Sequence, residues 1–339
     1  PVSLHRTTPL EQTAMMPLKQ MVMKLPKVGF LKGHGERSIV GSKNRDYSLF
    51  AYGRYFIHSL LNQGFDVTES VLQPGKDNLE DIDILVISDP MEAFEDWELK
   101  QLSDYIDSGK NLIIAGEPKR GEYLSPLLEK FGVCFIPGTL VQPIEEFPAD
   151  LLVVRSTLAG AKLSRINAGW RRSVFTMPGA MGIDSVADKG FQMIPLLVSR
   201  DSGCWNELET TDFVNEIVKL NPTIGERETQ MVTAMALKRE QNGRDQRVLV
   251  LGDADCISMG ELSAARRGIR ASNFSLIRGM FCWLSYEELP VDIGHPKAID
   301  NDLYLGTTSG LWVKVFVKWI LPLVVFLFGV ILLLRRQRK

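Results

Sequence analysis

The sequence of 339 residues contains only four cysteines and four histidines, and it has no CxxC pair. Without such a pair, a zinc ribbon and a thioredoxin-like motif are excluded. The cysteines are Cys134, Cys204, Cys256 and Cys282. Their wide, irregular spacing favours ordinary buried thiols, although a disulfide in an extracytoplasmic domain stays open.

Phosphate-binding motifs and a strong charge of one sign are also missing. Neither GxGxxG nor GxxxxGK[ST] occurs, so the sequence predicts no nucleotide cofactor. The 39 basic and 41 acidic side chains leave a net charge of −2. A balance so close to neutral gives no electrostatic footprint for nucleic acid, which we therefore do not expect as a partner.

One long hydrophobic run is present, near the end of the sequence. Residues 319–334 are 16 residues without a charge, which span about 24 Å as a helix. Since a bilayer core is about 30 Å thick, the run must extend back to Val315, with the Lys318 ammonium reaching the interface. The run is apolar on all faces, which favours a transmembrane helix over 315–334 rather than a buried core helix.

The charges that flank this run predict its orientation. Four basic residues follow it and two precede it: Arg335, Arg336, Arg338 and Lys339 against Lys314 and Lys318. The positive-inside rule then makes 335–339 a cytoplasmic tail and places the preceding domain outside the inner membrane. The first residue is Pro1 and no signal peptide opens the sequence, so we interpret it as part of a longer polypeptide cut upstream.

Residues 27–138 alternate short apolar runs with stretches of helical periodicity, after an irregular approach segment over 1–26. Strands are predicted at "KVGFLKG", "FDVTESVL", "IDILVISDP", "NLIIAGEP" and "VCFIPG", and helices at 46–64, at "WELKQLSDYIDSGK" and at 123–131. We expect Asp46 to cap the first helix at its start and Gly64 at its end. Such alternation is typical of an α/β, flavodoxin-like, doubly wound and mostly parallel sheet, in which ligands bind beyond the strand carboxyl ends.

The pattern changes over 139–246, where short strands separated by Gly/Pro turns predict a strand-rich inserted lobe. The alternation of strands and helices returns over 247–300. It consists there of the strand "QRVLVLGDADCIS", which we expect to join the first sheet, and a helix over 272–284. Residues 301–314 are predicted to be a juxtamembrane linker.

The stretch "LKGHGERS" offers the first candidate site, with Gly33, His34, Gly35, Glu36 and Arg37 after a strand. It is interpreted mainly as a tight turn whose side chains hydrogen-bond nearby loops, and alternatively as a ligand or partner contact. A hydrolase would need a nucleophile on a strand-to-helix turn beside a histidine. The turn "IIAGEPKRGE" has no Cys or Ser, so we predict no catalytic residue.

A second candidate is "GDADCISMGE", which follows a predicted buried strand. Asp253 and Asp255 could bind a cation together with Glu261. Carboxylates at a strand end more often accept hydrogen bonds from backbone N–H groups. We therefore expect structural carboxylates and no metal.

Several motifs taken in order resemble the gliding-motility auxiliary (GldG-like) extracytoplasmic component of ABC-type transport systems. They are "GHGERS", "RDYS", "DIDILVISDP", "GKNLIIAGEP", "RVLVLGDADCIS", "SNFSLIRGMFCWLS" and "ILPLVVFLFGVILLLRRQRK". The similarity runs from about Lys27 to the end and is weakest over 140–240. It implies a glutamine-amidotransferase-like domain that lacks catalytic residues.

The resemblance also implies a non-enzymatic component of the inner membrane that works with an ABC-type permease, as a subunit or fused domain, and with a cytoplasmic ATPase. The helix would lie in membrane lipid, and Gly329 would let a permease helix approach closely. The alternatives are an extracytoplasmic sugar- or peptide-binding sensor, which needs an aromatic-lined cleft near 33–36, and a hydrolase, which needs a histidine beside a cysteine or serine.

Overall fold

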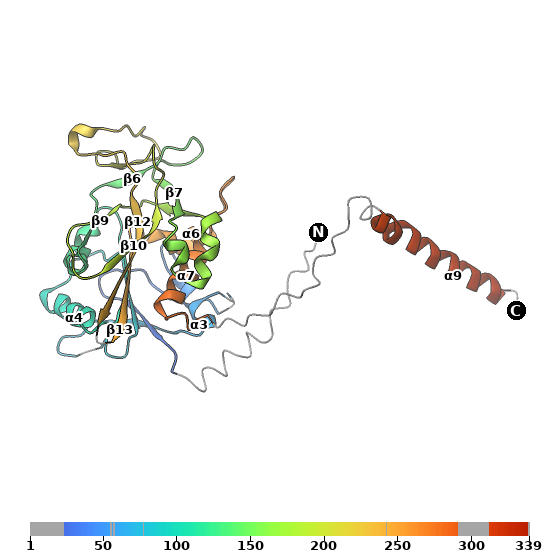
Figure 1. Cartoon of the computed structure of the whole chain (residues 1–339), viewed down its shortest axis with the longest axis horizontal. Coiled ribbons are helices and arrows are strands. Elements are labelled where there is room, and N and C mark those ends of the chain that lie inside the picture. The colour runs from blue at the N-terminus through green and yellow to red at the C-terminus, as the bar shows by residue number, and fades with distance from the viewer. Residues whose placement is uncertain are drawn as a thin grey trace. The chain divides into compact units, whose positions relative to one another are not determined.

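The computed structural model describes residues 24–290, apart from 55, 57, 77 and 242, and residues 312–337 (Figure 1). The chain divides into two units, one up to Asp292 and one from Ile293 onward. Most of the predicted approach segment and of the juxtamembrane linker lies outside the described residues.

The first unit is built on a sheet of eleven strands, five of which form a parallel half in the order β2-β1-β3-β4-β13. These are β1 (Lys27–Leu31), β2 (Asp66–Ser70), β3 (Ile84–Ser88), β4 (Asn111–Ala115) and β13 (Arg244–Leu251). Every residue of β3 and β4 is buried, as expected for central parallel strands covered on both faces. The predicted strands of this half, including the late return of β13, are confirmed.

The other half of the sheet is antiparallel, in the order β13-β12-β10-β7-β8. It consists of β7 (Leu151–Ser156), β8 (Val174–Pro178), β10 (Gln192–Val198) and β12 (Val232–Gln241), and β5 (Val133–Phe135) joins through β9 (Ile183–Ser185). Only two residues connect β12 to β13, and a connection that short permits antiparallel pairing alone. The fold is therefore α/β with a mixed sheet of parallel and antiparallel strands. The expectation of a mostly parallel sheet is wrong, and the flavodoxin-like arrangement is not confirmed.

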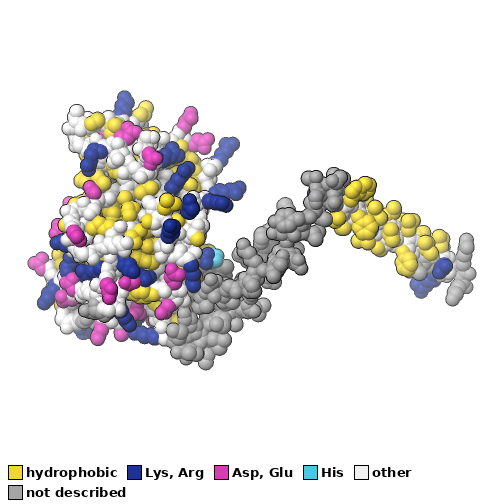
Figure 2. Space-filling model, viewed as in Figure 1, with side chains coloured by type: hydrophobic (Ala, Val, Ile, Leu, Met, Phe, Trp, Pro, Cys, Tyr) yellow, Lys and Arg dark blue, Asp and Glu magenta, His cyan; other side chains and the backbone are white. Residues whose placement is uncertain are grey.

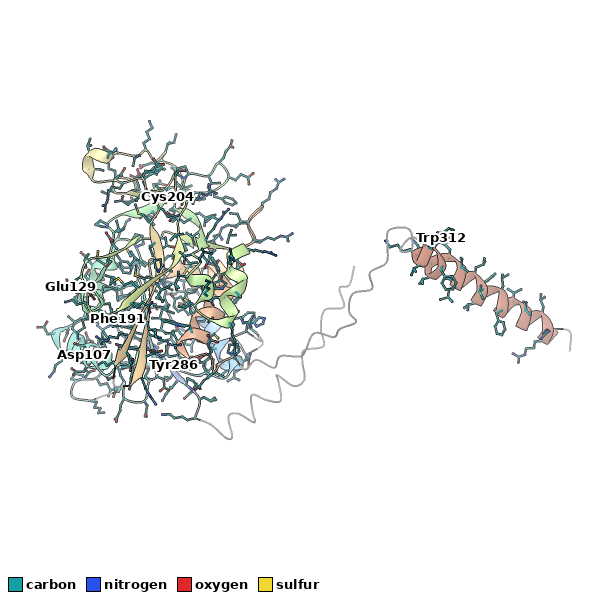
Figure 3. All side chains as sticks on the ribbon, viewed as in Figure 1. Asp107, Glu129, Phe191, Cys204, Tyr286 and Trp312 are labelled. Atoms are coloured by element: carbon teal, nitrogen blue, oxygen red, sulfur yellow. The ribbon has the colours of Figure 1, made fainter. Side chains whose placement is uncertain are left out.

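The predicted strand-rich lobe needs a related correction. Most strands of 139–246 extend the main sheet, because their apolar faces pack on its core. Apart from them, β6 (Thr139–Val141) and β11 (Trp205–Glu207) form a separate two-stranded sheet. It has a small core of its own, made by Val141, Ala149, Trp205 and Val218, and Cys204 lies in this region (Figure 3).

The predicted helix over 46–64 is broken in the structure. The chain forms α2 (Ser48–Tyr52) and α3 (Leu60–Gln63), and Gly53 leaves the helical conformation between them. The Asp46 carboxylate accepts a hydrogen bond from Lys43 N at 2.7 Å and does not cap α2. Gly64 does end α3, at a φ of 99°, so that part of the prediction is confirmed.

The remaining helices follow the predictions more closely. Helix α4 (Asp96–Asp107) begins with a capping box between Glu95 and Glu98. The segment predicted as one helix over 123–131 forms three short turns, η1 (Gly121–Leu124), α5 (Ser125–Leu128) and η2 (Glu129–Phe131). Helix α7 (Asn273–Leu284) matches its predicted range. Shorter helices are η3 (Gly160–Lys162), η4 (Arg165–Arg172), η5 (Pro222–Ile224), η6 (Asp255–Ile257) and α6 (Met259–Ser263).

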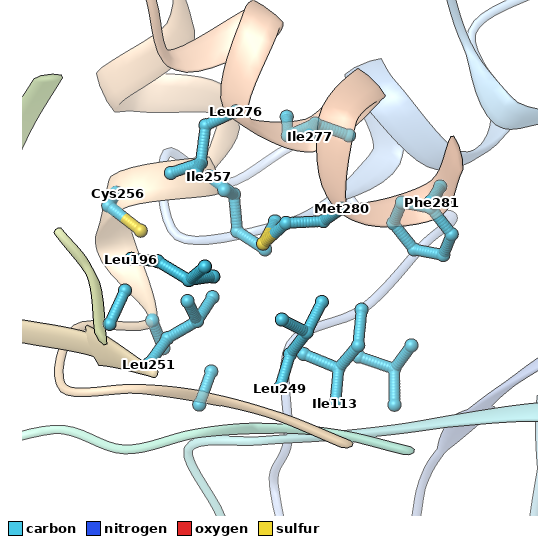
Figure 4. Packing of buried hydrophobic residues seen from close by; sticks show 14 of the residues in the cluster. Ile113, Leu196, Leu249, Leu251, Cys256, Ile257, Leu276, Ile277, Met280 and Phe281 are labelled. Carbon is cyan, nitrogen blue, oxygen red and sulfur yellow. The ribbon is translucent and has the colours of Figure 1, made fainter. Parts of the chain in front are cut away.

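The two faces of the sheet carry separate hydrophobic cores. On one face, Leu276, Ile277, Met280 and Phe281 of α7 point toward strands β4 and β13 (Figure 4). On the other face, α4 and α5 cover the sheet with side chains that include Leu102, Ile106 and Leu127. This double cover leaves the carboxyl ends of the parallel strands as the place where polar loops meet.

The second unit, as far as it is described, is one continuous helix. A turn of π-helix, η7 (Phe316–Ile320), precedes α9 (Leu321–Gln337). The helix Trp312–Arg336 has 25 residues, contains an 18-residue stretch with a mean hydropathy of 2.6, and is long and apolar enough to cross a membrane. This helix contains the predicted 315–334 and extends it at both ends.

Candidate functional site

The loops at the carboxyl ends of four parallel strands bring charged side chains together. Arg37 follows β1, Asp89 follows β3 directly, Glu117 follows β4, and Asp253 and Asp255 follow β13. Because parallel strands end at the same edge of a sheet, these residues converge although 218 positions separate Arg37 from Asp255. We call Arg37, Asp89, Glu117 and Asp255 the edge cluster.

Arg37 lies at the centre of the edge cluster, with 3% of its side chain exposed. Its Nη2 is 2.9 Å from Asp89 Oδ2 and 3.0 Å from Glu117 Oε1, and its Nη1 is 2.6 Å from Asp255 Oδ1. A guanidinium suits this position because its planar donors can reach several carboxylates at once. The three acceptors offset much of the cost of burying the charge.

Asp89 is fully buried and binds three guanidinium groups. Besides Arg37, it accepts hydrogen bonds from Arg45 Nη2 at 2.9 Å and from Arg120 Nε and Nη2 at 2.6 and 3.0 Å. Its backbone φ is +50°, an uncommon value for a residue other than glycine. The surrounding ion pairs hold this conformation at the strand end.

The protonation of the Glu117 carboxyl group is subject to opposing effects of its surroundings. Its Oε1 accepts hydrogen bonds at 3.0 Å from Arg37 Nη2, Ala254 N and Asp255 N, which favour the carboxylate. Burial, and then the nearby Asp255 carboxylate, favour the protonated form more strongly and raise the pKa of Glu117 to about 8.

A reactive thiol is not available beside the cluster. Cys256 is fully buried and its Sγ donates to Asp253 O at 3.1 Å. Burial raises the pKa of the Cys256 thiol well above its usual value, so the nucleophilic thiolate is disfavoured. Burial likewise raises the pKa of Asp253, whose Oδ1 accepts from Cys256 N at 3.1 Å.

Glu261, the third carboxylate of the possible cation site, is already paired in the structure. Both Glu261 oxygens accept from Arg266, each at 2.6 Å, which neutralises that carboxylate. In the part of the chain that the structure describes, no group of three or more Asp, Glu, His or Cys residues could hold a metal. The two strand-end carboxylates instead accept hydrogen bonds, Asp253 Oδ1 from Cys256 N and Asp255 Oδ1 from Arg37 Nη1.

The "GHGERS" turn is tied to its surroundings by hydrogen bonds. Glu36 Oε2 accepts from Gly33 N at 3.0 Å and from His34 N at 2.7 Å. The His34 ring is 2.9 Å from Glu98 Oε2 through Nε2 and packs against Phe94, with centroids 4.7 Å apart. The turn therefore connects the end of β1 to the start of α4, as the tight-turn interpretation expects.

A cavity of about 260 Å³ opens beside this turn. It is lined by Phe30, Leu31, Lys32, Gly33, Gly35, Glu36, Arg37, Ser38 and Glu69. Three buried polar atoms of its lining have no hydrogen-bond partner among the residues that the structure describes: Glu36 Oε1, Arg37 Nε and Glu69 Oε1. Phe30 is its single aromatic residue, so this cavity is not the aromatic-lined cleft that a sensor was expected to have.

A second cavity, of about 280 Å³, adjoins the edge cluster. It is lined by Asn44, Arg45, Pro178, Asp255, Ser258, Gly260 and Glu261. The Asp255 side chain is 37% exposed, more than those of the other three members of the cluster. The cluster therefore meets solvent mainly through Asp255.

Sequence reasoning found Arg37 and Asp255 but missed the roles of Asp89, Arg45 and Arg120. It treated Glu117 only as the place where a nucleophile is missing. A usable signal was present, because "SDP" and "GEP" each put a carboxylate at the end of a predicted buried strand. The sequence did not give the strand order, and only that order makes the ends of these strands neighbours.

The comparison with protein families decides the assignment. The family described as "ABC-type uncharacterized transport system" matches residues 25–276. The chain belongs to this family. The match includes both halves of the sheet and all four members of the edge cluster, and it confirms the resemblance to an auxiliary component of ABC-type transport systems.

Among solved structures, the mmIFT52 N-terminal domain shows similarity of fold. The mmIFT52 N-terminal domain is 16% identical with a TM-score of 0.53, over 79% of this chain and 100% of that domain. A thua-like protein from Parabacteroides merdae is 11% identical with a TM-score of 0.38, over 81% and 94% of the two chains. No curated protein matches the chain.

Proposed function

We propose that this chain is a membrane-anchored, non-enzymatic auxiliary component of an ABC-type transport system of the gliding-motility kind. The family match over 25–276 carries the proposal. The apolar helix Trp312–Arg336 supports the membrane anchor. The edge of the sheet that carries ligands in related α/β folds is occupied by an internally paired ion cluster, which supports a binding or scaffolding role over catalysis.

The partners in this proposal are an ABC-type permease, as a subunit or a fused domain, and a cytoplasmic ATPase reached through it. The sequence contains no phosphate-binding loop, so the ATPase must supply hydrolysis. The α/β unit lies outside the inner membrane in this proposal, because four basic residues follow the helix and two precede it.

Co-purification from detergent tests the proposal. The full chain carries an affinity tag and is isolated from its native membranes, and an unrelated single-span protein with the same tag is the control. A permease and an ABC ATPase should be enriched with the full chain only. Recovery of the chain without either subunit, under conditions that keep other transporters assembled, would contradict the proposal.

A second candidate is an extracytoplasmic sensor of sugars or peptides; the cavity beside "GHGERS" lacks the aromatic lining expected for one, and the candidate rests on the unpaired polar atoms of that cavity alone. Glu36 Oε1 and Glu69 Oε1 can accept from ligand hydroxyl or ammonium groups, and Arg37 Nε can donate to a ligand oxygen. Monosaccharides, disaccharides and short peptides can be screened by thermal shift with the full chain in detergent. A ligand of this cavity must lose its stabilising effect in Glu69→Gln, and the same loss in Glu122→Gln, an exposed site elsewhere, would contradict the assignment.

A further inference from the structure

Charge is strongly segregated along this nearly neutral chain. Residues 151–183 contain five Lys or Arg and no acidic residue, and residues 262–286 contain four Arg and no acidic residue. By contrast, residues 66–107 contain thirteen Asp or Glu and two Lys. The small net charge therefore hides two regions of opposite sign.

The two basic segments lie against each other in the fold. Val174 pairs with Ala271 in an isolated parallel bridge, and Ser272 N donates to Val174 O at 2.9 Å. The indole Nε1 of buried Trp170 in η4 donates to Ser275 Oγ of α7 at 3.1 Å. These contacts bring η4 and the loop before α7 to one side of the unit.

Six exposed basic side chains surround this junction, and Figure 2 shows Lys and Arg side chains along the edge beside η4. We call them the basic face: Lys162, Arg165, Arg171, Arg172, Arg267 and Arg270. The side chains of Arg171, Arg172, Arg267 and Arg270 make no hydrogen bond or ion pair within the described residues. In contrast, Arg266 of the same loop is neutralised by Glu261.

The segregation follows the sheet. The acidic segment 66–107 contributes β2, at one end of the strand order, and the inner strand β3, whereas the basic segment 151–183 contributes β7 and β8, at the other end. A negatively charged surface attracts the basic side chains at that end, which orients the unit.

We propose that the basic face docks on the anionic headgroups of the bilayer that holds the chain's own helix. The inference rests on the membrane anchor of the proposed function. Pro290, whose backbone oxygen accepts a hydrogen bond from Arg165 of the basic face, and Trp312 are separated by 21 residues, a connection that reaches at most about 80 Å. Basic side chains beside an anionic leaflet gain electrostatic energy, and tethering raises their effective concentration at that surface.

Lipid quenching in nanodiscs tests the docking. The full chain, in a Cys134→Ser background, carries a fluorophore at Ala168→Cys, an exposed position in η4. It is incorporated into discs of phosphatidylcholine alone or mixed with phosphatidylglycerol, each with a headgroup-quencher lipid. We expect at least a several-fold stronger quenching in the anionic discs. High salt should abolish it, because the Debye length falls from about 10 Å at 0.1 M to about 3 Å at 1 M.

Two charge-matched variants separate the basic face from net charge. Arg171→Gln, Arg172→Gln, Arg267→Gln and Arg270→Gln together should remove the quenching. Lys76→Gln, Lys100→Gln, Lys189→Gln and Arg244→Gln remove the same four charges from exposed sites elsewhere and should preserve it. Equal melting temperatures exclude misfolding as the cause.

The outcomes distinguish the docking from the anchor. Incorporation into discs with equal quenching in neutral and anionic lipid overturns the docking alone, and so does quenching that survives the loss of the four arginines. A chain that does not incorporate into discs at all overturns the membrane anchor and the docking together.

Discussion

Arg37 and Asp89 form an ion pair of 2.9 Å between side chains that are 3% and 0% exposed. They come from the loops after β1 and β3, which are neighbouring parallel strands. Arg37 N also donates to Ser88 O at 3.3 Å, so backbone and side chain join the same two loops. The pair therefore holds these two loops together, and Glu117 and Asp255 contact the same guanidinium.

Arg37→Ala should strongly destabilise the fold. It removes the cation shared by Asp89, Glu117 and Asp255, and breaking a buried ion pair by deleting one partner typically costs about 3–5 kcal/mol. Denaturant unfolding of the full chain in detergent measures the change. Arg45→Ala is the control, since Arg45 is 28% exposed and Asp89 keeps two other guanidinium partners. Equal losses for the two variants would show that Arg37 is not central.

Glu117 should make stability depend on pH. The folded protein keeps the Glu117 proton up to a pKa of about 8, whereas the unfolded chain releases it near 4.5. The unfolded state therefore binds fewer protons between these values, and unfolding free energy falls as pH rises, by at most about 1.4 kcal/mol per pH unit. Glu117→Gln keeps an acceptor oxygen and removes the titration.

The measurement for Glu117 is the difference in unfolding free energy between Glu117→Gln and the unchanged chain from pH 5 to pH 8. This difference should grow in favour of the variant as pH rises. A difference that stays flat over that interval would mean that the three hydrogen bonds to Glu117 Oε1 outweigh burial and keep the carboxylate ionised.

The "GHGERS" turn should matter for stability and not for hydrolysis. Glu36→Ala leaves Gly33 N and His34 N without their acceptor, which should cost about 1–3 kcal/mol. Glu36→Gln retains an acceptor oxygen and should cost less, and exposed Glu122→Ala should be neutral. An amidase, esterase or glycosidase activity of the chain that His34→Ala with Glu36→Ala eliminates, while the fold survives, would refute the non-catalytic interpretation.

Gly329 should contribute to association with the permease. No atom of the described residues lies within 4 Å of a Cβ built on Gly329, so another helix can approach closely there. Gly329→Leu should weaken co-purification of the permease, and an unrelated transmembrane segment in place of the helix should weaken it further. Val324→Leu, five positions earlier on the helix, is the control. Undiminished recovery after the helix swap would make the helix an anchor alone.

The orientation of the helix can be tested directly. Alkaline phosphatase and green fluorescent protein are fused in turn after Lys339, whose side the basic residues after the helix predict to be cytoplasmic. We expect an inactive phosphatase and a fluorescent protein. An active phosphatase with a dark fluorescent protein would reverse the topology.

The sequence by itself determined the local elements of this protein. The runs "ILVIS" and "NLIIA" each have four apolar residues in a row and became the buried central strands, and the charge-free run became one long helix. Each of these features depends on residues that are close together in the chain.

Tertiary structure decided the pairing of these elements. The antiparallel half depends on the two-residue connection between β12 and β13, and "NG" there was a hairpin signal that periodicity alone did not reveal. Gly53 interrupts the predicted helix over 46–64, where local apolar spacing suggested continuity. Arg37 meets a carboxylate 218 positions away because strand order, set by burial of both sheet faces, makes the ends of β1, β3, β4 and β13 neighbours.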